Sequence, residues 1–314
     1  MRYALLSDIH GNLPALLAVL EDAKKHDVHQ FLLLGDYVED FPWPNEVVQT
    51  IRALENGIVI RGNKEDYLLN MGGEDQSQWV YEQMAPMYWN YRALTADHLD
   101  YLVALPASKE IKTRTGASIC LSHISSIFYR QPQMTLFNSS MCFDIMRVSS
   151  FSHQEYLEMA CKAALGNQEV MAEIAQKPPG VYVFGHNHMQ WHMELEGKIF
   201  VNPGSCGMPL DFDTGAPYTI LEQSNGDWRI IERRVPYDTE AAIQALRSSE
   251  LFAQADIWSR IMIQQLRTGG DLINHFLRYA QGLARERGRP VHPISNDLWR
   301  EAAATFELWN IFEG

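Results

Sequence analysis

Acidic, imidazole and amide side chains recur in short polar motifs along the first 190 residues of this chain. Such oxygen and nitrogen donors suit Mn²⁺, Fe or Zn²⁺ better than ions that prefer thiolates. The candidate ligands are Asp8, His10, Asp36, Asn63, His123, His186 and His188. Seven groups are too many for one tetrahedral zinc ion, so they favour two ions that share a bridging carboxylate. Two ions about 3.5–4 Å apart can activate water and stabilise displacement at phosphorus.

Apolar segments must position these motifs, because each motif directly follows one of them. The segments are 3–7, 31–34, 58–60, 111–121 (a hairpin turning at Gly116) and 181–184. The first three alternate with helical stretches, which predicts parallel strands with helices on their faces. An open sheet leaves a crevice at the carboxyl ends of its strands, so distant ligands should meet there. A single histidine at a strand end is more often structural, and only the joint pattern favours a metal centre.

The rest of the chain separates into an α/β part and a helical tail. We expect helical insertions over about residues 65–105 and 125–178, and two late strands, 218–222 and 228–235, joined near Asn225-Gly226. After Pro236 helical periodicity dominates, which predicts three or four helices. We therefore expect two domains, 1–237 and 238–314. The helices of the second domain have apolar stripes that must pack against something. The alternatives are the first domain, a position over the site, or a second copy of the chain in a homo-oligomer.

Composition excludes several classes of function. The chain has 314 residues, with 26 Lys and Arg against 39 Asp and Glu, a formal charge of −13. Because so acidic a surface repels phosphate backbones, general nucleic-acid binding is not expected. No apolar run approaches the roughly 18 residues of a membrane span, so no membrane partner is expected. An N-terminus that soon turns polar and four scattered cysteines predict a cytoplasmic protein with reduced thiols.

In order along the chain, the motifs resemble those of the calcineurin-like metallophosphoesterases, and finer features resemble the small prokaryotic, phosphodiesterase-like branch. The motifs are Asp8-Ile9-His10-Gly11-Asn12, Gly35-Asp36, Gly62-Asn63, His123 and Gly185-His186-Asn187-His188. The finer features are Leu13-Pro14-Ala15-Leu16, Pro44-Asn45-Glu46-Val47-Val48 and Asn202-Pro203-Gly204-Ser205. This resemblance covers about residues 1–237. It implies an α/β fold, a four-layer α/β/β/α sandwich, to which the C-terminal all-helical extension is added.

The resemblance also implies a dinuclear centre of divalent ions, which are Mn, Fe, Ni or Zn. One ion would be held by Asp8, His10 and His188. The other would be held by Asn63, His123 and His186. Asp36 would bridge them, and the catalytic residues would be Asp36, His10 and Asn63. The implied reaction is hydrolysis of a phosphoester by attack of a metal-bound hydroxide, without a covalent enzyme intermediate.

One departure from the family pattern bears on the substrate. The family often has Gly-Asn-His-Asp or Gly-Asn-His-Glu, whose histidine assists departure of the leaving group, whereas this chain has Gly62-Asn63-Lys64-Glu65. Lysine has an ordinary pKa near ~10.4, against ~6.5 for histidine, so Lys64 is a poor proton donor at neutral pH. This favours a phosphodiester of a small substrate. A phosphomonoesterase acting on nucleotides or phosphoproteins, and a metal-binding regulatory or scaffold protein with little activity, stay open as alternatives.

Substrate contacts are predicted at a few further residues. Lys64 offers positive charge to a phosphate, and Arg130 lies beside Tyr129 in the second insertion. Asn12 is expected to cap the first helix, whose N-terminus favours anions. His192 lies four residues after His188, and on a strand the two would share a face.

Two sets of residues are expected to lie outside the chemistry. Asp40 and Asp66 are interpreted as loop acids rather than ligands. An aromatic group is interpreted as the core face of a helix, with a nucleobase pocket as the alternative; its members are Trp79, Tyr81, Tyr88, Trp89 and Tyr91.

Overall fold

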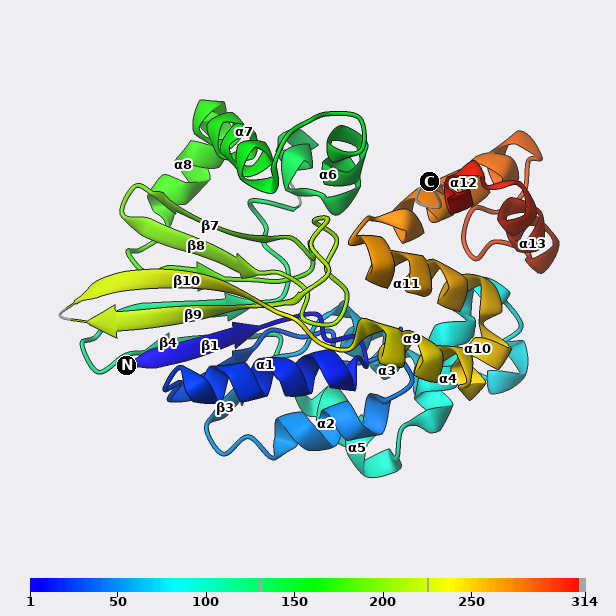
Figure 1. Ribbon diagram of the computed structural model, residues 1–314, viewed down its shortest axis with the longest axis horizontal. Helices are drawn as coiled ribbons and strands as arrows, with labels where there is room; N and C mark the ends of the chain where they lie inside the picture. Colours follow the sequence, from blue (N-terminus) through cyan, green and yellow to red (C-terminus); the bar gives the residue numbers. More distant parts are fainter. Residues whose placement is uncertain (130–131, 225, 311–314) are drawn as a thin grey trace.

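The computed structural model describes residues 1–129, 132–224 and 226–310, and its strands form two mixed sheets (Figure 1). The first sheet has the order β10-β9-β1-β2-β3, in which β1, β2 and β3 are parallel and β9 is antiparallel to β1 and β10. Its strands are β1 (Arg2–Leu6), β2 (Gln30–Leu33), β3 (Gly57–Val59), β9 (Ala216–Ser224) and β10 (Asp227–Val235).

The second sheet has the order β4-β5-β6-β8-β7, with a parallel centre and antiparallel strands at both edges. Its strands are β4 (Ser108–Lys112), β5 (Ser118–Ser122), β6 (Val181–Val183), β7 (Gln190–Leu195) and β8 (Lys198–Pro203). The predicted hairpin over 111–121 is β4 and β5, with Gly116 at a positive φ of 86° between them. The strand β7, which follows directly after the last histidine motif, was not predicted from the sequence.

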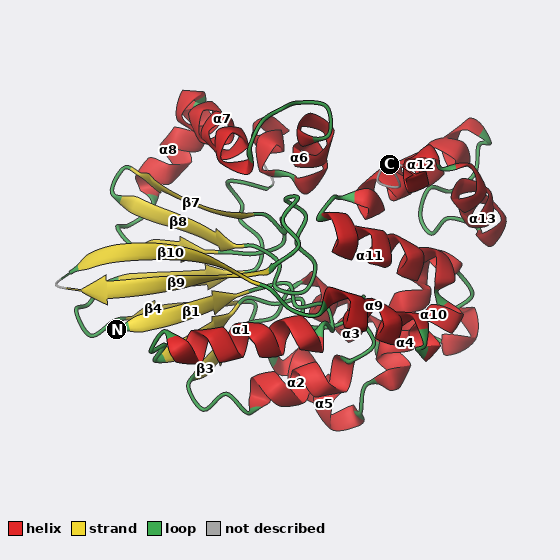
Figure 2. Ribbon diagram, in the orientation of Figure 1, coloured by secondary structure: helices red, strands yellow, loops and turns green. Residues whose placement is uncertain are grey.

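Helices cover the outer faces of both sheets (Figure 2). The first sheet packs on α1 (Leu13–Lys25), α2 (Pro44–Arg52) and α5 (Ala96–Ala104), and the second on α6 (Ser139–Met146), α7 (His153–Gly166) and α8 (Gln168–Gln176). Along β1, Ala4 and Leu6 face the helices, whereas Tyr3 and Leu5 enter an apolar layer between the sheets. This alternation is the period of two expected for a strand. The predicted α/β/β/α sandwich is therefore confirmed.

Local sequence signals explain where the site-bearing elements begin. The side chain of Asn12 accepts a hydrogen bond from the backbone nitrogen of Ala15, and Pro14 lies in the first turn of α1. The first insertion contains α3 (Asn63–Met71), two short 3₁₀ turns, η1 (Gln76–Gln78) and η2 (Glu82–Met84), and α4 (Ala85–Ala93). A third turn, η3 (Pro132–Phe137), precedes α6. Both predicted insertions are thus helical.

The C-terminal segment is helical, as predicted, but it contains more helices than expected. Its described residues form α9 (Thr239–Arg247), α10 (Glu250–Gln254), α11 (Asp256–Thr268), α12 (Leu272–Glu286), α13 (Asn296–Thr305) and η4 (Glu307–Asn310). Ala255 leaves the helical conformation between α10 and α11, and Gly269 ends α11 in the left-handed conformation. Among the described residues, no helix combines the length and the apolar character needed to span a membrane.

These C-terminal helices share a hydrophobic core with the sandwich. Residues such as Ile261, Phe276 and Trp299 pack in one cluster with Phe41 and Met208, which lie in loops next to the strand ends. Of the three locations predicted for the apolar stripes, the structure therefore shows packing on the sandwich. Figure 1 places α11 and α12 beyond the carboxyl ends of the strands.

Candidate metal centre

All seven predicted ligands lie together: six are in the loops that follow β1, β2, β5 and β6, and Asn63, after β3, is the first residue of α3. One group comprises Asp8, His10 and His188, and a second comprises Asp36, His123 and His186; within each group the possible ligand atoms lie within 4.8 Å of one another. The amide oxygen of Asn63 lies 3.1 Å from Nε2 of His123. The structure thus contains two candidate metal-binding groups.

The backbone at five of these residues is left-handed. The φ angles are positive at Asp8 (54°), His10 (55°), Asp36 (55°), His186 (70°) and His188 (57°). Such conformations cost about 1–3 kcal/mol each for residues other than glycine and cluster at functional sites. The surrounding fold therefore holds these loops in conformations that direct the side chains into one centre.

Two glycines allow the loops to approach each other closely. A Cβ atom on Gly62 would lie 2.2 Å from Oδ1 of Asp36, and one on Gly185 would lie 2.5 Å from Oδ2 of Asp8. Neither distance is compatible with a side chain. Each glycine in the Gly-Asn and Gly-His motifs therefore makes room for a carboxylate of the centre.

Polar contacts made by Nδ1 orient three of the imidazoles. Nδ1 of His123 donates to the carbonyl of Leu34 at 2.7 Å, and Nδ1 of His188 donates to that of Met208 at 2.9 Å. Nδ1 of His10 lies 2.6 Å from Oδ2 of Asp40. With the proton on Nδ1, each Nε2 presents its lone pair to the centre, which is the tautomer that a metal ligand needs.

Asp40 corrects the sequence interpretation, which placed it among loop acids. It is buried, and besides orienting His10 it accepts a hydrogen bond of 2.6 Å from Nε1 of Trp258 on α11. The C-terminal helices thus contact the centre through one carboxylate. Asp66, in contrast, forms an ion pair with Arg61. No short-range pattern reveals the Asp40 contact, because its partners lie 30 and 218 residues away.

Glu65 is a second residue that sequence reasoning missed. Its buried carboxylate accepts backbone hydrogen bonds from Asp36 at 2.9 Å, Tyr37 at 2.9 Å and Gly62 at 2.7 Å. It therefore ties the loop after β2 to the start of α3. The spacing Gly62-x-x-Glu65 is that of a capping box, which is the signal that could have identified it.

The centre attracts positive charge. Burial opposes protonation of the imidazoles, but Asp40 raises the pKa of His10 to about 10 and Asp36 raises that of His123 to about 9. Despite burial, His188 and His10 hold the pKa of Asp8 well below its usual range. Within the described chain, Oδ1 of Asp8 accepts no hydrogen bond and lies 3.3–3.9 Å from three histidine Nε2 atoms. The lone pairs of this oxygen and of the Nε2 atoms face one another, which fits binding of divalent cations. Such cations compete with protons for the nitrogens.

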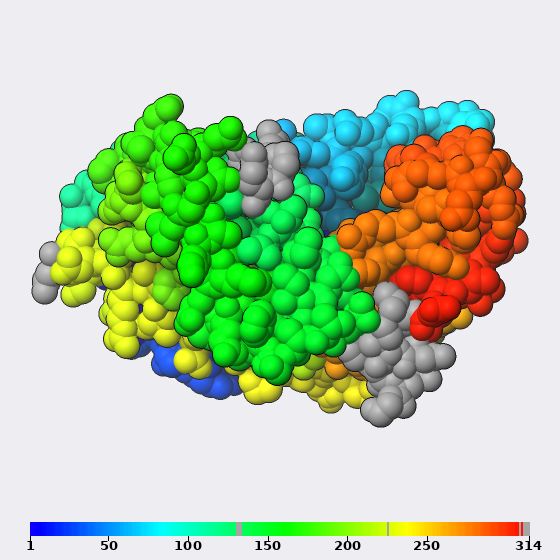
Figure 3. Space-filling view, turned by 90° about the horizontal axis from the view of Figure 1, so that it is seen from above, coloured from blue at the N-terminus to red at the C-terminus, as the bar shows by residue number. Residues whose placement is uncertain are grey.

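A cavity of about 510 Å³ opens onto both groups. One side is formed by Asn63, Lys64 and Tyr129, and the opposite side by Leu277 and other residues of α11 and α12. Figure 3 shows a hollow between the insertion that contains α6, in green, the first insertion, in cyan, and α12, in orange. The C-terminal helices therefore line the site as well as packing on the sandwich.

The structure brings some of the predicted substrate contacts to this cavity. Lys64 lines it, and its ammonium forms a buried ion pair with Glu39. Tyr129 also lines it, with its ring centroid 4.3 Å from that of His186. Arg130, predicted to act beside Tyr129, lies outside the described residues.

Two of the predicted substrate contacts do not line this cavity. The Asn12 side chain is buried as the cap of α1, and its amide donates to the carbonyl of Gly207 at 2.8 Å and the hydroxyl of Tyr237 at 3.1 Å. His192 lies on β7 with Nδ1 2.7 Å from Glu232 of β10, and it does not line the cavity. In both cases another group of the protein, distant in the sequence, contacts the side chain.

Comparisons with known proteins agree with this geometry. The family model of the calcineurin-like phosphoesterases matches residues 1–190. An uncharacterised protein of Methanocaldococcus jannaschii is 26% identical over 263 residues, covering 79% of this chain and 93% of that protein. A solved metallophosphoesterase from Sphaerobacter thermophilus has 24% identity and a TM-score of 0.58, covering 86% of this chain and 100% of its own.

A hypothetical protein of Pyrococcus horikoshii, also solved, has 20% identity and a TM-score of 0.59, covering 86% of this chain and 98% of its own. These likenesses support the fold. The family match spans more than half of the residues and contains all seven candidate ligands. The chain therefore belongs to the calcineurin-like phosphoesterase family, whose members are metal-dependent hydrolases of phosphate esters.

Proposed function

We propose that this chain is a dinuclear metal-dependent phosphodiesterase that acts on a small substrate. The observation that carries the proposal is the convergence of two buried groups of ligand atoms on one open cavity. In this proposal Asp8, His10 and His188 hold one ion. Asn63, His123 and His186 hold the other, and Asp36 bridges them. Two bound ions would supply an activated water molecule and positive charge for the phosphate.

The residues of the chain itself would orient the substrate and the centre. Asn63 is the first residue of α3, so the positive end of that helix lies at the cavity and favours a phosphate. The backbone nitrogen of Lys64 donates to Oδ1 of Asp36 at 2.9 Å, which fixes the bridging carboxylate. Asp40 and Glu65 hold the ligands from behind.

Lys64 supports a diester rather than a monoester. Although burial opposes its charge, Glu39 and Asp40 raise the pKa of Lys64 above its ordinary value, so it keeps its proton at neutral pH. It therefore cannot replace the histidine that delivers a proton to a leaving group. A diester carries one negative charge and a monoester up to two. The carboxylates of Glu39 and Asp40 beside the site therefore repel a diester less strongly than a monoester.

The ion and the location are part of the same proposal. Because the ligands are oxygen and nitrogen atoms with no thiolate among them, we infer that Mn²⁺ activates the enzyme, with Fe, Ni and Zn as the other metals to test. The cytoplasmic location inferred from the sequence stays a prediction.

The test is hydrolysis of bis(p-nitrophenyl) phosphate and of p-nitrophenyl phosphate by Mn²⁺-loaded protein. We expect the wild type to prefer the diester and His123→Ala to lose at least about 100-fold in kcat, since it removes a ligand. The matched control is His192→Ala, which removes a histidine outside the cavity and should retain full activity. Wild-type turnover by the His123 variant, or hydrolysis of the monoester alone, would contradict the proposal.

A further inference from the structure

A second cavity, of about 730 Å³, lies beside the metal centre, and its volume is typical of a small-molecule site. We call it the aromatic chamber. It is bounded by α3, the segment from η1 to α4, and the C-terminal helices. Lys64, Trp258 and Leu277 line both this chamber and the cavity of the metal centre, so the two spaces share a wall. The chamber is therefore the space to consider for the organic group of a substrate whose phosphate lies at the centre.

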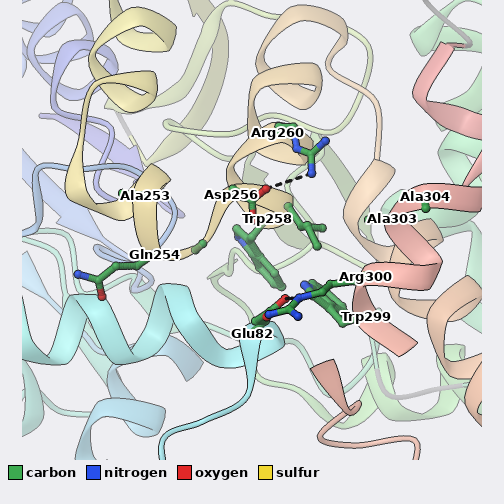
Figure 4. Close-up of a pocket in the computed structure, with 12 residues that line it drawn as sticks. Glu82, Ala253, Gln254, Asp256, Trp258, Arg260, Trp299, Arg300, Ala303 and Ala304 are labelled. Carbon is green, nitrogen blue, oxygen red and sulfur yellow. Dashed lines mark hydrogen bonds and ion pairs between the residues drawn. The ribbon is translucent and has the colours of Figure 1, made fainter. Parts of the chain in front are cut away.

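Trp258 stands at the junction of these spaces. Its indole nitrogen is bound to Asp40, and it also borders a separate cavity of about 490 Å³ toward α13 (Figure 4). That third space is an unpromising ligand site because its charged side chains are already paired, Arg260 with Asp256 and Arg300 with Glu82. The aromatic chamber, in contrast, borders the cavity of the metal centre at Lys64, Trp258 and Leu277.

Five aromatic side chains line the chamber: Tyr67, Trp79, Tyr81, Tyr88 and Trp258. Trp79 is a core residue, although it lies just after η1 rather than on the face of a helix as expected, and it is stacked on Tyr88 with ring centroids 5.0 Å apart and an interplanar angle of 2°. Tyr67, however, is 47% exposed, and its ring centroid lies 5.9 Å from Nζ of Lys64. Tyr67 can therefore stack on a planar group without a change in the core.

The charged groups of the chamber restrict what that planar group can be. Its walls carry the carboxylates of Glu39, Glu74 and Asp75, and Lys64 is the only lysine or arginine among the described residues that line it. Nε1 of Trp79 donates to Glu74 at 2.9 Å, which fixes that carboxylate at the wall. Such a surface accepts hydrogen bonds from amino groups and repels a second phosphate. The heterocycle of a nucleoside, with its amino group, fits these requirements.

We propose that the aromatic chamber binds the nucleobase of a nucleoside phosphodiester whose phosphate lies at the metal centre. This inference rests on the proposed function. Tyr67 is then a specificity-determining residue that stacks on the base, and Glu74 accepts a hydrogen bond from its amino group. An oligophosphate is a poorer fit because its additional negative charges would face the carboxylates.

The test compares three p-nitrophenyl phosphodiesters with the same leaving group, in which the second ester is adenosine (through its 5′ oxygen), phenyl or methyl. The Mn²⁺-loaded wild type, Tyr67→Ala and Tyr67→Phe are assayed. Removal of an aromatic side chain from a base stack costs about 5- to 100-fold. We expect Tyr67→Ala to lose that factor in kcat/KM on the adenosine ester, mainly through KM, and to change less than about twofold on the methyl ester. Tyr67→Phe should retain wild-type values.

Each other outcome has a defined meaning. Equal kcat/KM of the wild type on the adenosine and methyl esters overturns the inference but leaves the proposed function intact. A preference for the phenyl ester over the adenosine ester would show that the chamber binds a simple aromatic ring rather than a nucleobase, and this also overturns the inference. If no ester is hydrolysed, the proposed function fails. Fluorescence titration with adenosine 5′-monophosphate then decides, because a Kd that is the same in wild type and Tyr67→Ala overturns the chamber assignment.

Discussion

Replacement of Gly62 by alanine tests the geometry of the centre with a single methyl group. Gly62 has φ −105° and ψ −167°, an extended conformation that alanine adopts without strain. The added Cβ would lie 2.2 Å from Oδ1 of Asp36 and 2.6 Å from its backbone nitrogen. Because carbon and oxygen normally approach to about 3.3 Å, the carboxylate must move by about 1 Å. A misplacement of that size costs about 10²-fold in rate.

The assay measures kcat on the preferred phosphodiester together with bound metal by elemental analysis. We expect Gly62→Ala to fold, to lose about 100-fold in kcat and to bind metal more weakly. Gly73→Ala is the matched control, because a Cβ there meets nothing within 4 Å. Wild-type kcat and metal content in Gly62→Ala would refute the argument that Asp36 must occupy this position.

Three further predictions concern metal affinity and stability. Asp40→Asn should weaken metal binding about 10- to 100-fold, measured by competition with a fluorescent chelator, because the carboxylate orients His10; unchanged affinity would exclude that role. Saturating Mn²⁺ should raise the Tm of the wild type, because each ion at 100 times its Kd adds about 2.7 kcal/mol to the free energy of unfolding. The Tm of Asp36→Asn should rise much less. Burial alone would raise the pKa of Asp22, but hydrogen bonds from Arg233 and Tyr218 lower it. Its stabilisation is therefore complete above the unfolded-state pKa and is lost as pH falls through the folded-state pKa. Urea unfolding should show Asp22→Asn to be about 1 kcal/mol less stable at pH 7, with a difference that shrinks in acid; a difference that grows in acid would refute this sign.

Strands and ligands were predictable because each depends on a local signal. Apolar runs such as 31–34 and 181–184 can only be buried strands, and the polar residues after them must lie at the carboxyl edge of the sheet. The cap at Asn12 and the turn at Gly116 were also local features. Short-range signals thus indicated these strands and the polar motifs that follow them.

Contacts between distant segments were not predictable in this way. Trp258 reaches Asp40 only because α11 packs over the strand ends, and no periodicity in α11 encodes that placement. Spacing suggested that His192 shares a face with His188, whereas its side chain pairs with Glu232 of β10 and does not line the cavity. The positive φ angles of the ligand loops likewise arise from tertiary packing rather than from residue type.

A crystal structure of the Mn²⁺-loaded protein, with anomalous scattering measured near the manganese edge, tests the central claim most directly. The account predicts two peaks about 3.5–4 Å apart, with Asp36 between them, His10 and His188 at one and His123 and His186 at the other. A single peak, or peaks outside the cavity lined by these residues, would contradict it.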